Sequence, residues 1–182
     1  LEALKLTDTN NLNFSRALSG LGVLYAKMGN YELAEKYLSE TLKNRQTALG
    51  INHLDYANSL NNLASLYFTI NNYIQAEKYY LNALEIRKSS LGINHPDYAN
   101  SLNGLANLYY DIGNHAQAEK YYLASLDTYK STMMVHHPHY ARIKNALGCL
   151  YGHMGNYEQG EVLLKEVLEF DKEKYGLFHI NY

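Results

Sequence analysis

The sequence predicts an all-α protein built as a solenoid of antiparallel helix pairs, and three observations lead to this fold class. First, the phrase LGINHLDYANSLNNLASLYF at residues 49–68 returns at residues 91–110 as LGINHPDYANSLNGLANLYY, an offset of 42 residues. Second, apolar residues within each copy recur at helical spacing. Third, a Gly-Asn or Asn-Asn pair separates two helical stretches in every copy. A fixed period of roughly 20 to 50 residues is typical of solenoids, whose stacked units bury one another's apolar faces.

The period divides the chain into four repeats, which we expect at residues 12–53, 54–95, 96–137 and 138–179. Residues 1–11 are expected to be the tail of a preceding repeat, because LEALKL is similar to the end of a second helix, and residues 180–182 the start of a following one. Solenoids normally finish with a polar capping helix, and none is visible. We therefore expect a segment of a longer array. The period is marked by His53, His95, His137 and His179, and also by Phe14, Tyr56, Tyr98, Tyr140 and Tyr182.

Each repeat contains two helical stretches. The apolar stripe of the first stretch has steps of three, one and three residues, which keep one face of a helix. In repeat 2 the first stripe consists of Leu60, Leu63, Ala64 and Tyr67, and it recurs in repeat 3 as Leu102, Leu105, Ala106 and Tyr109. The second stripe consists of Ala76, Tyr79, Tyr80, Ala83 and Leu84, and it recurs as Ala118, Tyr121, Tyr122, Ser125 and Leu126.

The junctions carry turn and capping signals. Glycine and asparagine tolerate the left-handed backbone that often ends a helix, and an asparagine beside them can cap the next helix. We therefore expect tight turns at Gly29-Asn30, Asn71-Asn72, Gly113-Asn114 and Gly155-Asn156. At the other junction, Pro96 and Pro138 suit a first helical turn, and Asp55 and Asp97 suit the positive end of a helix dipole.

Composition and charge exclude several classes of protein. The chain is 47% hydrophobic and 19% charged, which is ordinary for a soluble domain, and no run of about 18 apolar residues is present to span a bilayer. A net charge of -2 with interspersed signs gives no basic surface for nucleic acid. Cys149 is the only cysteine, so an internal disulfide and a thiolate zinc cluster are excluded. No secretory signal is visible. We expect a cytoplasmic protein with no cofactor and no membrane or nucleic-acid partner.

The pattern Leu18-x-x-Leu21-Gly22-x-x-Tyr25 followed by Ala34-x-x-x-Leu38 resembles the tetratricopeptide repeat, with leucine in place of its usual tryptophan. The 42-residue period and the phrase LGxxHPDYAxSLNNLAxLY are similar to the kinesin light chain type of that family. The resemblance implies a right-handed superhelix of helix pairs, in which the first helices line a concave groove that receives an extended peptide or a partner helix.

The residues also locate that groove. At about 100° per residue, the helix face opposite the buried stripe of each first helix would line it. This face carries amides and aromatics in the central repeats, where a solvated face would normally be rich in Glu and Lys. The candidate groove residues are Arg16, Ser19 and Lys27 in repeat 1, Asn58, Asn61, Ser65 and Phe68 in repeat 2, Asn100, Asn103, Asn107, Tyr110 and Asp111 in repeat 3, and Arg142, Asn145, Cys149 and His153 in repeat 4.

The amide ladder predicts hydrogen bonding to a peptide backbone. Asn61, Asn103 and Asn145 each offer two donors and an acceptor, which suit main-chain N–H and C=O groups of any sequence. Phe68 and Tyr110 would add apolar contact, while the cations Arg16, Lys27 and Arg142 would meet acidic side chains of the partner. The alternative is that these amides bind neighbouring helices, since buried polar groups are normally hydrogen-bonded.

Three other sites are less favoured. The carboxylate-clamp type of the family needs lysines where this chain has Ser19, Asn61 and Asn103.

A catalytic Cys-His-Asp group is less favoured too. Cys149 and His153 lie four residues apart on one helix face, and Asp111 is the counterpart of His153 in the preceding repeat. Neither a glycine-rich elbow nor an oxyanion donor accompanies them.

A metal site on the histidines is also less favoured. Stacked helices lie about 8–10 Å apart, whereas a zinc–nitrogen bond is about 2.0–2.1 Å, so the one histidine per repeat cannot share an ion. His136 and His139 would chelate weakly at most. A loop and capping role for the recurring histidines is preferred.

Two classes of function follow. The first is a binding module whose groove captures a linear segment of another protein, or of its own parent chain as an autoinhibitory arm. The second is an architectural spacer, in which stacking is the whole purpose. Arrays of this family are often joined to other domains, so an intramolecular partner domain is also possible. An enzyme is not expected.

Overall fold

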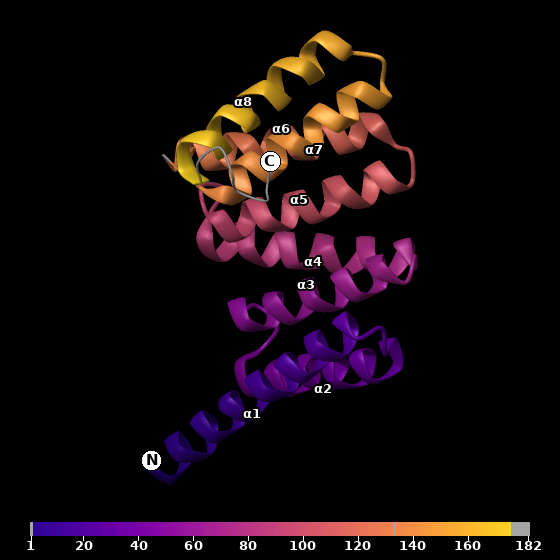
Figure 1. Ribbon diagram of the computed structural model, residues 1–182. Helices are drawn as coiled ribbons and strands as arrows, with labels where there is room; N and C mark the ends of the chain where they lie inside the picture. The colour runs from indigo at the N-terminus through magenta and orange to yellow at the C-terminus, as the bar shows by residue number, and fades with distance from the viewer. Residues whose placement is uncertain (1, 133, 176–182) are drawn as a thin grey trace. The chain divides into compact units, whose positions relative to one another are not determined.

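Eight helices account for the regular structure of the part of the chain that the computed structural model describes, residues 2–132 and 134–175, and that part contains no strand (Figure 1). The side chains are described for residues 12–132 and 134–174. In chain order, the helices are α1 (Glu2–Lys27), α2 (Tyr31–Leu49), α3 (Leu54–Thr69), α4 (Tyr73–Leu91), α5 (Pro96–Asp111), α6 (His115–Ser131), α7 (Pro138–His153) and α8 (Tyr157–Tyr175).

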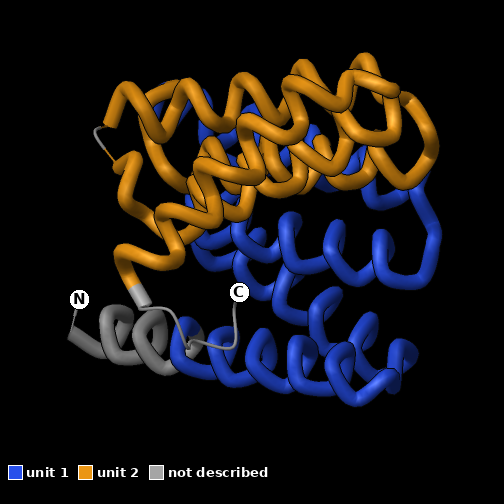
Figure 2. The backbone as a smooth tube through the Cα atoms, turned by 45° about the horizontal axis from the view of Figure 1, so that its top comes forward, with its two compact units in different colours: residues 1–92 blue, residues 93–182 orange. Residues whose placement is uncertain are grey.

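The helices form two compact units (Figure 2). Unit 1 comprises residues 1–92 and contains the hairpins α1–α2 and α3–α4, while unit 2 comprises residues 93–182 and contains α5–α6 and α7–α8. Within each unit, the second helix of one hairpin packs against the first helix of the next: α2 against α3, and α6 against α7. The predicted antiparallel helix pairs are therefore present in both units.

The turns inside the hairpins have the predicted left-handed residues. Gly29 has φ 78° and Asn71 has φ 59°, and Gly113 and Gly155 adopt the same region. Because a β-carbon is strained at such φ values, glycine and asparagine are the favoured residues here. The asparagine that follows then caps the next helix: the side chains of Asn30, Asn72 and Asn114 accept hydrogen bonds from Leu33, Gln75 and Gln117.

The recurring histidines cap the first helices, as the sequence predicted. Nδ1 of His53 accepts a hydrogen bond from the backbone N–H of Asp55 at 3.0 Å, and His95 and His137 do the same two residues ahead of themselves. Pro96 and Pro138 stand in the first turns of α5 and α7. His179 lies outside the described residues.

The core of unit 1 lies between its two hairpins. Ala34 and Leu38 of α2 pack with Leu63 and Leu66 of α3, and all four side chains are buried. In each hairpin of unit 1, a tyrosine of the first helix stacks on a tyrosine of the second helix. The ring centroids of Tyr25 and Tyr37 in the first hairpin lie 5.5 Å apart. In the inward stripe predicted for repeat 2, Leu60, Leu63 and Ala64 are at most 2% exposed, and Tyr67 is half-buried.

The core of unit 2 is similarly arranged but contains buried tyrosines. Tyr122 and Tyr129 of α6 pack with Ile143, Leu147 and Leu150 of α7. In the last hairpin the helices approach closely at a pair of glycines, because a β-carbon at Gly160 would lie 2.8 Å from the carbonyl oxygen of Gly148.

The helix boundaries follow the period. Helices α3, α5 and α7 begin at Leu54, Pro96 and Pro138, the first residues of the expected repeats 2, 3 and 4. Helix α1 runs without a break through the expected boundary between residues 11 and 12, and residues 180–182 lie outside the described part of the chain. Among the described residues, no helix combines the length and the apolar character that crossing a membrane requires.

Candidate peptide-binding face

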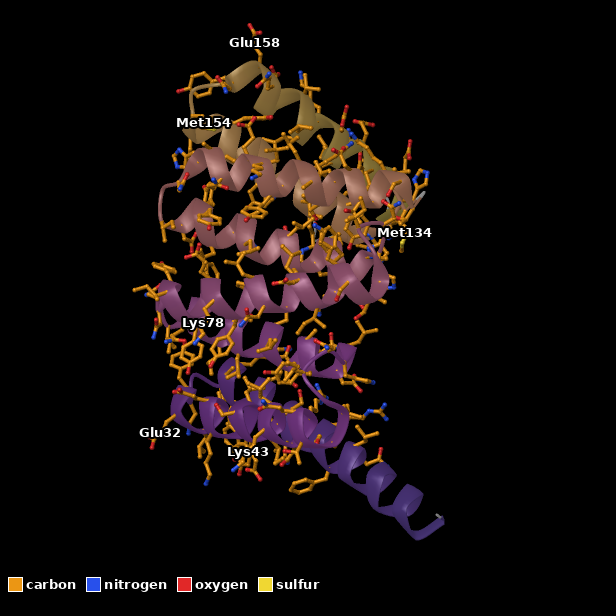
Figure 3. All side chains as sticks on the ribbon, turned by 180° about the vertical axis from the view of Figure 1, so that it is seen from behind. Glu32, Lys43, Lys78, Met134, Met154 and Glu158 are labelled. Carbon is orange, nitrogen blue, oxygen red and sulfur yellow. The ribbon has the colours of Figure 1, made fainter. Side chains whose placement is uncertain are left out.

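The candidate groove residues lie on the faces of α1, α3, α5 and α7 that are opposite the buried stripes. On α3, Asn58, Asn61 and Phe68 are half-buried and Ser65 is exposed. This composition differs from the outer faces of the second helices, where exposed charged residues such as Glu32 and Lys43 of α2 point outward (Figure 3). The amides of α3 are therefore not fully open to solvent.

In unit 1, the amides of α3 are bound by a buried arginine. Arg87 of α4 is 5% exposed, and its Nη2 donates a hydrogen bond to Oδ1 of Asn58 at 2.7 Å. Its Nη1 lies 3.4 Å from Oδ1 of Asn61 and makes a weaker bond. The amide oxygens of both asparagines are therefore engaged within their own hairpin.

Three further groove residues of unit 1 lie close to side chains of neighbouring helices. Nδ2 of Asn62 on α3 donates to Oγ of Ser19 on α1 at 3.2 Å. Burial raises the pKa of Tyr80 on α4, and the neighbouring Ser65 side chain opposes this shift. At the end of α3, the ring of Phe68 is tilted against Tyr73 with the centroids 6.2 Å apart.

The two candidate cations on α1 are exposed. Arg16 and Lys27 are both exposed on α1. Neither side chain makes a hydrogen bond or an ion pair with another described residue. Their contact with an acidic partner stays a prediction.

In unit 2, two of the amides of α5 are engaged. Oδ1 of Asn100 accepts hydrogen bonds from Tyr129 of α6 at 3.3 Å and from Nδ1 of His139 on α7 at 3.0 Å. Oδ1 of Asn107 accepts a short bond, 2.6 Å, from the hydroxyl of Tyr122. Burial of Tyr122 is the main reason that its pKa is raised.

The amides of Asn103 and Asn145 are free within the described part of the chain. They occupy equivalent positions, 42 residues apart, on α5 and α7. Asn103 is half-buried and Asn145 is exposed, and neither side chain has a hydrogen-bond partner among the described residues. Unit 2 therefore retains unpaired amide donors and acceptors on two successive first helices.

The other end of this face contains a tyrosine–histidine pair. The hydroxyl of Tyr110 on α5 and Nδ1 of His153 on α7 lie 2.6 Å apart and share a hydrogen bond, and the two rings are stacked. Burial raises the pKa of Tyr110, and the nearby Cys149 and Asp111 add to this shift. Desolvation also raises the pKa of the Asp111 carboxyl, although the side chain is exposed.

Arg142 is the candidate cation of unit 2, and it lies on the side of this face nearer the start of α7. Arg142 is exposed on α7. The pKa of His139 is lowered by burial first and then by the charges of Arg142 and His137. Burial raises the pKa of Tyr129, and Arg142 opposes that shift.

The suspected Cys-His-Asp group is not assembled as a catalytic triad. Nδ1 of His153 faces Tyr110, and no hydrogen bond joins Cys149 to His153 within the described residues. The histidine cluster is similarly engaged, because Nδ1 of His137 binds the backbone of His139 and Nδ1 of His139 binds Asn100. Among the described residues, no three potential ligand side chains are gathered to hold a metal ion.

The sequence reasoning missed the residues of the second helices that reach the amides. Arg45 and Arg87 are 6% and 5% exposed, and they lie 42 residues apart in otherwise apolar stripes. A repeated arginine at a buried stripe position was a signal that it would need oxygen acceptors on a neighbouring helix, because buried charges are normally hydrogen-bonded.

The family model of the tetratricopeptide repeat matches residues 13–81, 71–131 and 103–173 of the chain. No curated protein matches the chain in sequence. Neither the family model nor the similar structures indicate an enzymatic family.

Several solved structures share the fold. BtubC (BKLC) from P. vanneervenii has a TM-score of 0.79 and 21% identity over 91% of this chain and 66% of that one. A putative kinesin light chain from Podosopora anserina with nearly identical TPR-like repeats has a TM-score of 0.77 and 20% identity, over 91% and 78%. MamA has a TM-score of 0.64 and 20% identity, over 97% and 89%. This chain spans about two thirds of BtubC. The predicted all-α repeat fold is confirmed.

Proposed function

The chain belongs to the tetratricopeptide repeat family, and from this premise we propose that it is a protein-interaction module whose first helices bind an extended peptide or a partner helix. Proteins of this family generally serve as scaffolds for protein partners. The bound segment can belong to another protein or to a further domain of the same polypeptide. In this proposal the contact residues are the free amides of the candidate face together with its aromatic and positively charged side chains.

The observation that carries this proposal is the pair of free amides in unit 2. Asn103 and Asn145 have no intramolecular hydrogen-bond partner among the described residues, although asparagine is a mediocre helix former. An amide that costs helix stability and gains no internal bond is better explained by an external partner. A peptide backbone suits it, because the amide can donate to a C=O and accept from an N–H at the same time.

The surrounding residues would add contacts of other kinds. Tyr110 and His153 form a stacked aromatic pair at one end of the face, and Arg142 is an exposed cation near the other end. An extended peptide on α5 and α7 would therefore meet backbone-binding amides between an aromatic contact and a positive charge.

An architectural role is favoured for a different set of residues. Asn58, Asn61 and Asn107 have their amide oxygens bound to second-helix side chains of the same hairpins. Such bonds satisfy buried donors and fix the packing of the hairpin. These three amides would therefore contribute to stability, whether or not a ligand is bound.

The test uses peptides selected from a random linear display library on the immobilised chain. Their affinities are measured by isothermal titration calorimetry with the wild type and with the double variant N103A/N145A. Each lost hydrogen bond costs about 0.5–1.5 kcal/mol, so we expect roughly tenfold weaker binding with the melting temperature nearly unchanged.

The matched control removes two exposed amides from second helices, Asn82 of α4 and Gln159 of α8. The variant N82A/Q159A should bind the selected peptides within about twofold of the wild type. If no peptide is selected, or if N103A/N145A binds as tightly as the wild type, the proposal is wrong. A clear drop in melting temperature of N103A/N145A would instead assign these amides to the architecture.

A further inference from the structure

The guanidinium of Arg45 in unit 1 is only partly satisfied. Arg45 belongs to α2 and is 6% exposed. Its Nη1 donates to the carbonyl oxygen of Asp55 and to Oγ of Ser59, both at 2.9 Å. Its Nε is buried without a hydrogen-bond partner, and its Nη2 has none among the described residues. One whole edge of this planar group therefore lacks an acceptor.

The equivalent arginine of the next repeat shows what is missing. Arg87 lies 42 residues after Arg45, and its Nη2 donates to Oδ1 of Asn58 at 2.7 Å. The position equivalent to Asn58 in repeat 1 is Arg16. A guanidinium has no acceptor. The replacement of asparagine by arginine therefore removes the oxygen that the buried arginine needs.

In the third repeat, as in the second, a side chain of the second helix donates a hydrogen bond to an asparagine of the first helix. Tyr129 occupies the position of Arg87, and its hydroxyl donates to Oδ1 of Asn100, which occupies the position of Asn58. In both repeats, a donor on the second helix meets an amide oxygen on the first. Repeat 1 is the exception, because its first helix supplies a second cation at that place.

The charges around Arg45 also indicate that the site lacks negative charge. Burial lowers the pKa of Arg45 most, the charge of Asp55 opposes this, and the charge of Arg16 lowers the pKa further. Arg16 therefore lies close enough to repel the buried guanidinium. Oδ2 of Asp55 lies 4.0 Å from Nδ1 of His53, and the carboxylate makes no ion pair with either arginine among the described residues. An external anion would relieve this repulsion.

We propose that Arg16 and Arg45 form a binding site for a carboxylate side chain of a peptide that lies on the α1 and α3 face of unit 1. One carboxylate oxygen takes the place that Oδ1 of Asn58 holds for Arg87 and accepts from Nη2 of Arg45. The other oxygen accepts from Arg16, as in charge-assisted arginine–carboxylate pairs. The site rests on the proposed function, because it makes an acidic residue the preferred ligand residue on the first helices of unit 1.

The decisive variant is Arg16→Asn, which restores the arrangement of repeat 2. Its asparagine would supply the acceptor for Arg45 and remove the competing charge. The control is Lys43→Asn, an exposed position on α2 of the same unit. It loses the same charge and has a similar helix-propensity cost. The probes are N-acetylated, C-amidated hexaglutamate and hexaglutamine, titrated at pH 7 and low salt.

We expect the wild type and K43N to bind hexaglutamate at least fivefold more tightly than hexaglutamine. R16N should bind hexaglutamate at least threefold more weakly than K43N and should melt at a higher temperature than K43N. In NMR spectra, the Nε–H signal of Arg45 should shift when hexaglutamate binds the wild type and stay unchanged with hexaglutamine. If R16N does not fold, Arg16→Gln replaces it in the same comparison.

Three results would overturn the site: no binding of hexaglutamate by the wild type in the millimolar range, a difference between R16N and K43N smaller than threefold, or an unshifted Arg45 signal. These results are independent of the test of the proposed function, which uses selected peptides and the amides of unit 2. If N103A/N145A loses the selected peptides while R16N and K43N behave alike, peptide binding stands and the carboxylate site fails.

Discussion

The first helices of the two units carry asparagines at equivalent positions, but the second helices offer these asparagines different hydrogen-bond donors. In unit 1, the guanidinium of Arg87 donates hydrogen bonds to the amide oxygens of both Asn58 and Asn61. In unit 2, the hydroxyl of Tyr129 donates a hydrogen bond to Asn100, and the side chain has no second donor for Asn103. Because a guanidinium has five N–H donors and a tyrosine has one, the change from arginine to tyrosine on the second helix leaves an amide free on the first.

The comparison also separates the chemistry of the two faces. Unit 1 combines engaged amides with one buried guanidinium, that of Arg45, which lacks an acceptor along one edge, whereas unit 2 combines free amides with a tyrosine–histidine pair. The repeat pattern thus fixes where a side chain lies, and the partner on the second helix decides whether it is available to a ligand.

The largest expected effect is a loss of unfolding free energy, which tests whether the hydrophobic cores of the two units contribute equally to stability. Leu63 in unit 1 and Leu147 in unit 2 are each 1% exposed at equivalent positions of α3 and α7. Leu63→Ala and Leu147→Ala should each lower the free energy of unfolding by about 2–5 kcal/mol, through lost burial and a cavity. Urea unfolding followed by circular dichroism measures both. A loss below about 1 kcal/mol in either would mean that its unit lacks the described core.

A smaller effect sharpens the comparison of the amide partners. Tyr122→Phe removes the hydroxyl that donates to Asn107, and Tyr80→Phe removes the equivalent buried hydroxyl of unit 1, which lies near Ser65. Each should cost about 0.5–1.5 kcal/mol of unfolding free energy, measured by the same urea titrations. Equal stability of both variants and the wild type would show that these tyrosines do not hold the first helices. Tyr122→Phe should also free Asn107 for a ligand.

The smallest effect is a pH dependence specific to unit 2, where His139 stands at the position of Asp55 in unit 1. Its folded-state pKa is lowered from 6.5, first by burial and then by Arg142 and His137. The unfolded chain therefore binds the proton more readily, so this contribution to stability is present above pH 6.5 and is lost as the pH falls below it. Thermal melts from pH 8 to 5 should show a steeper decline for the wild type than for His139→Gln. Parallel curves would contradict this assignment.

Most of the fold was predictable because it depends on local signals that recur. The left-handed Gly29 and Asn71, the capping Asn30 and the first-turn Pro96 act within a few residues of themselves. The inward stripe of α3 follows from helical geometry alone. These features need no knowledge of which helix packs against which.

The site was predictable only in its position. Helical spacing placed Asn61, Asn103 and Asn145 on one face, but it could not distinguish the engaged Asn61 from the two free amides. That distinction depends on how far Arg87 reaches across from α4, which is a property of packing between helices. The arginine repeat at positions 45 and 87 contained part of this information.

The most direct test of the central claim is an NMR titration that follows the side-chain NH₂ signals of the asparagines while a selected peptide is added. If the second-helix partners decide availability, the signals of Asn103 and Asn145 shift on binding, while those of Asn58, Asn61 and Asn107 stay near their free positions. Shifts confined to the engaged amides, or no shift of Asn103 and Asn145 at saturation, would contradict the account.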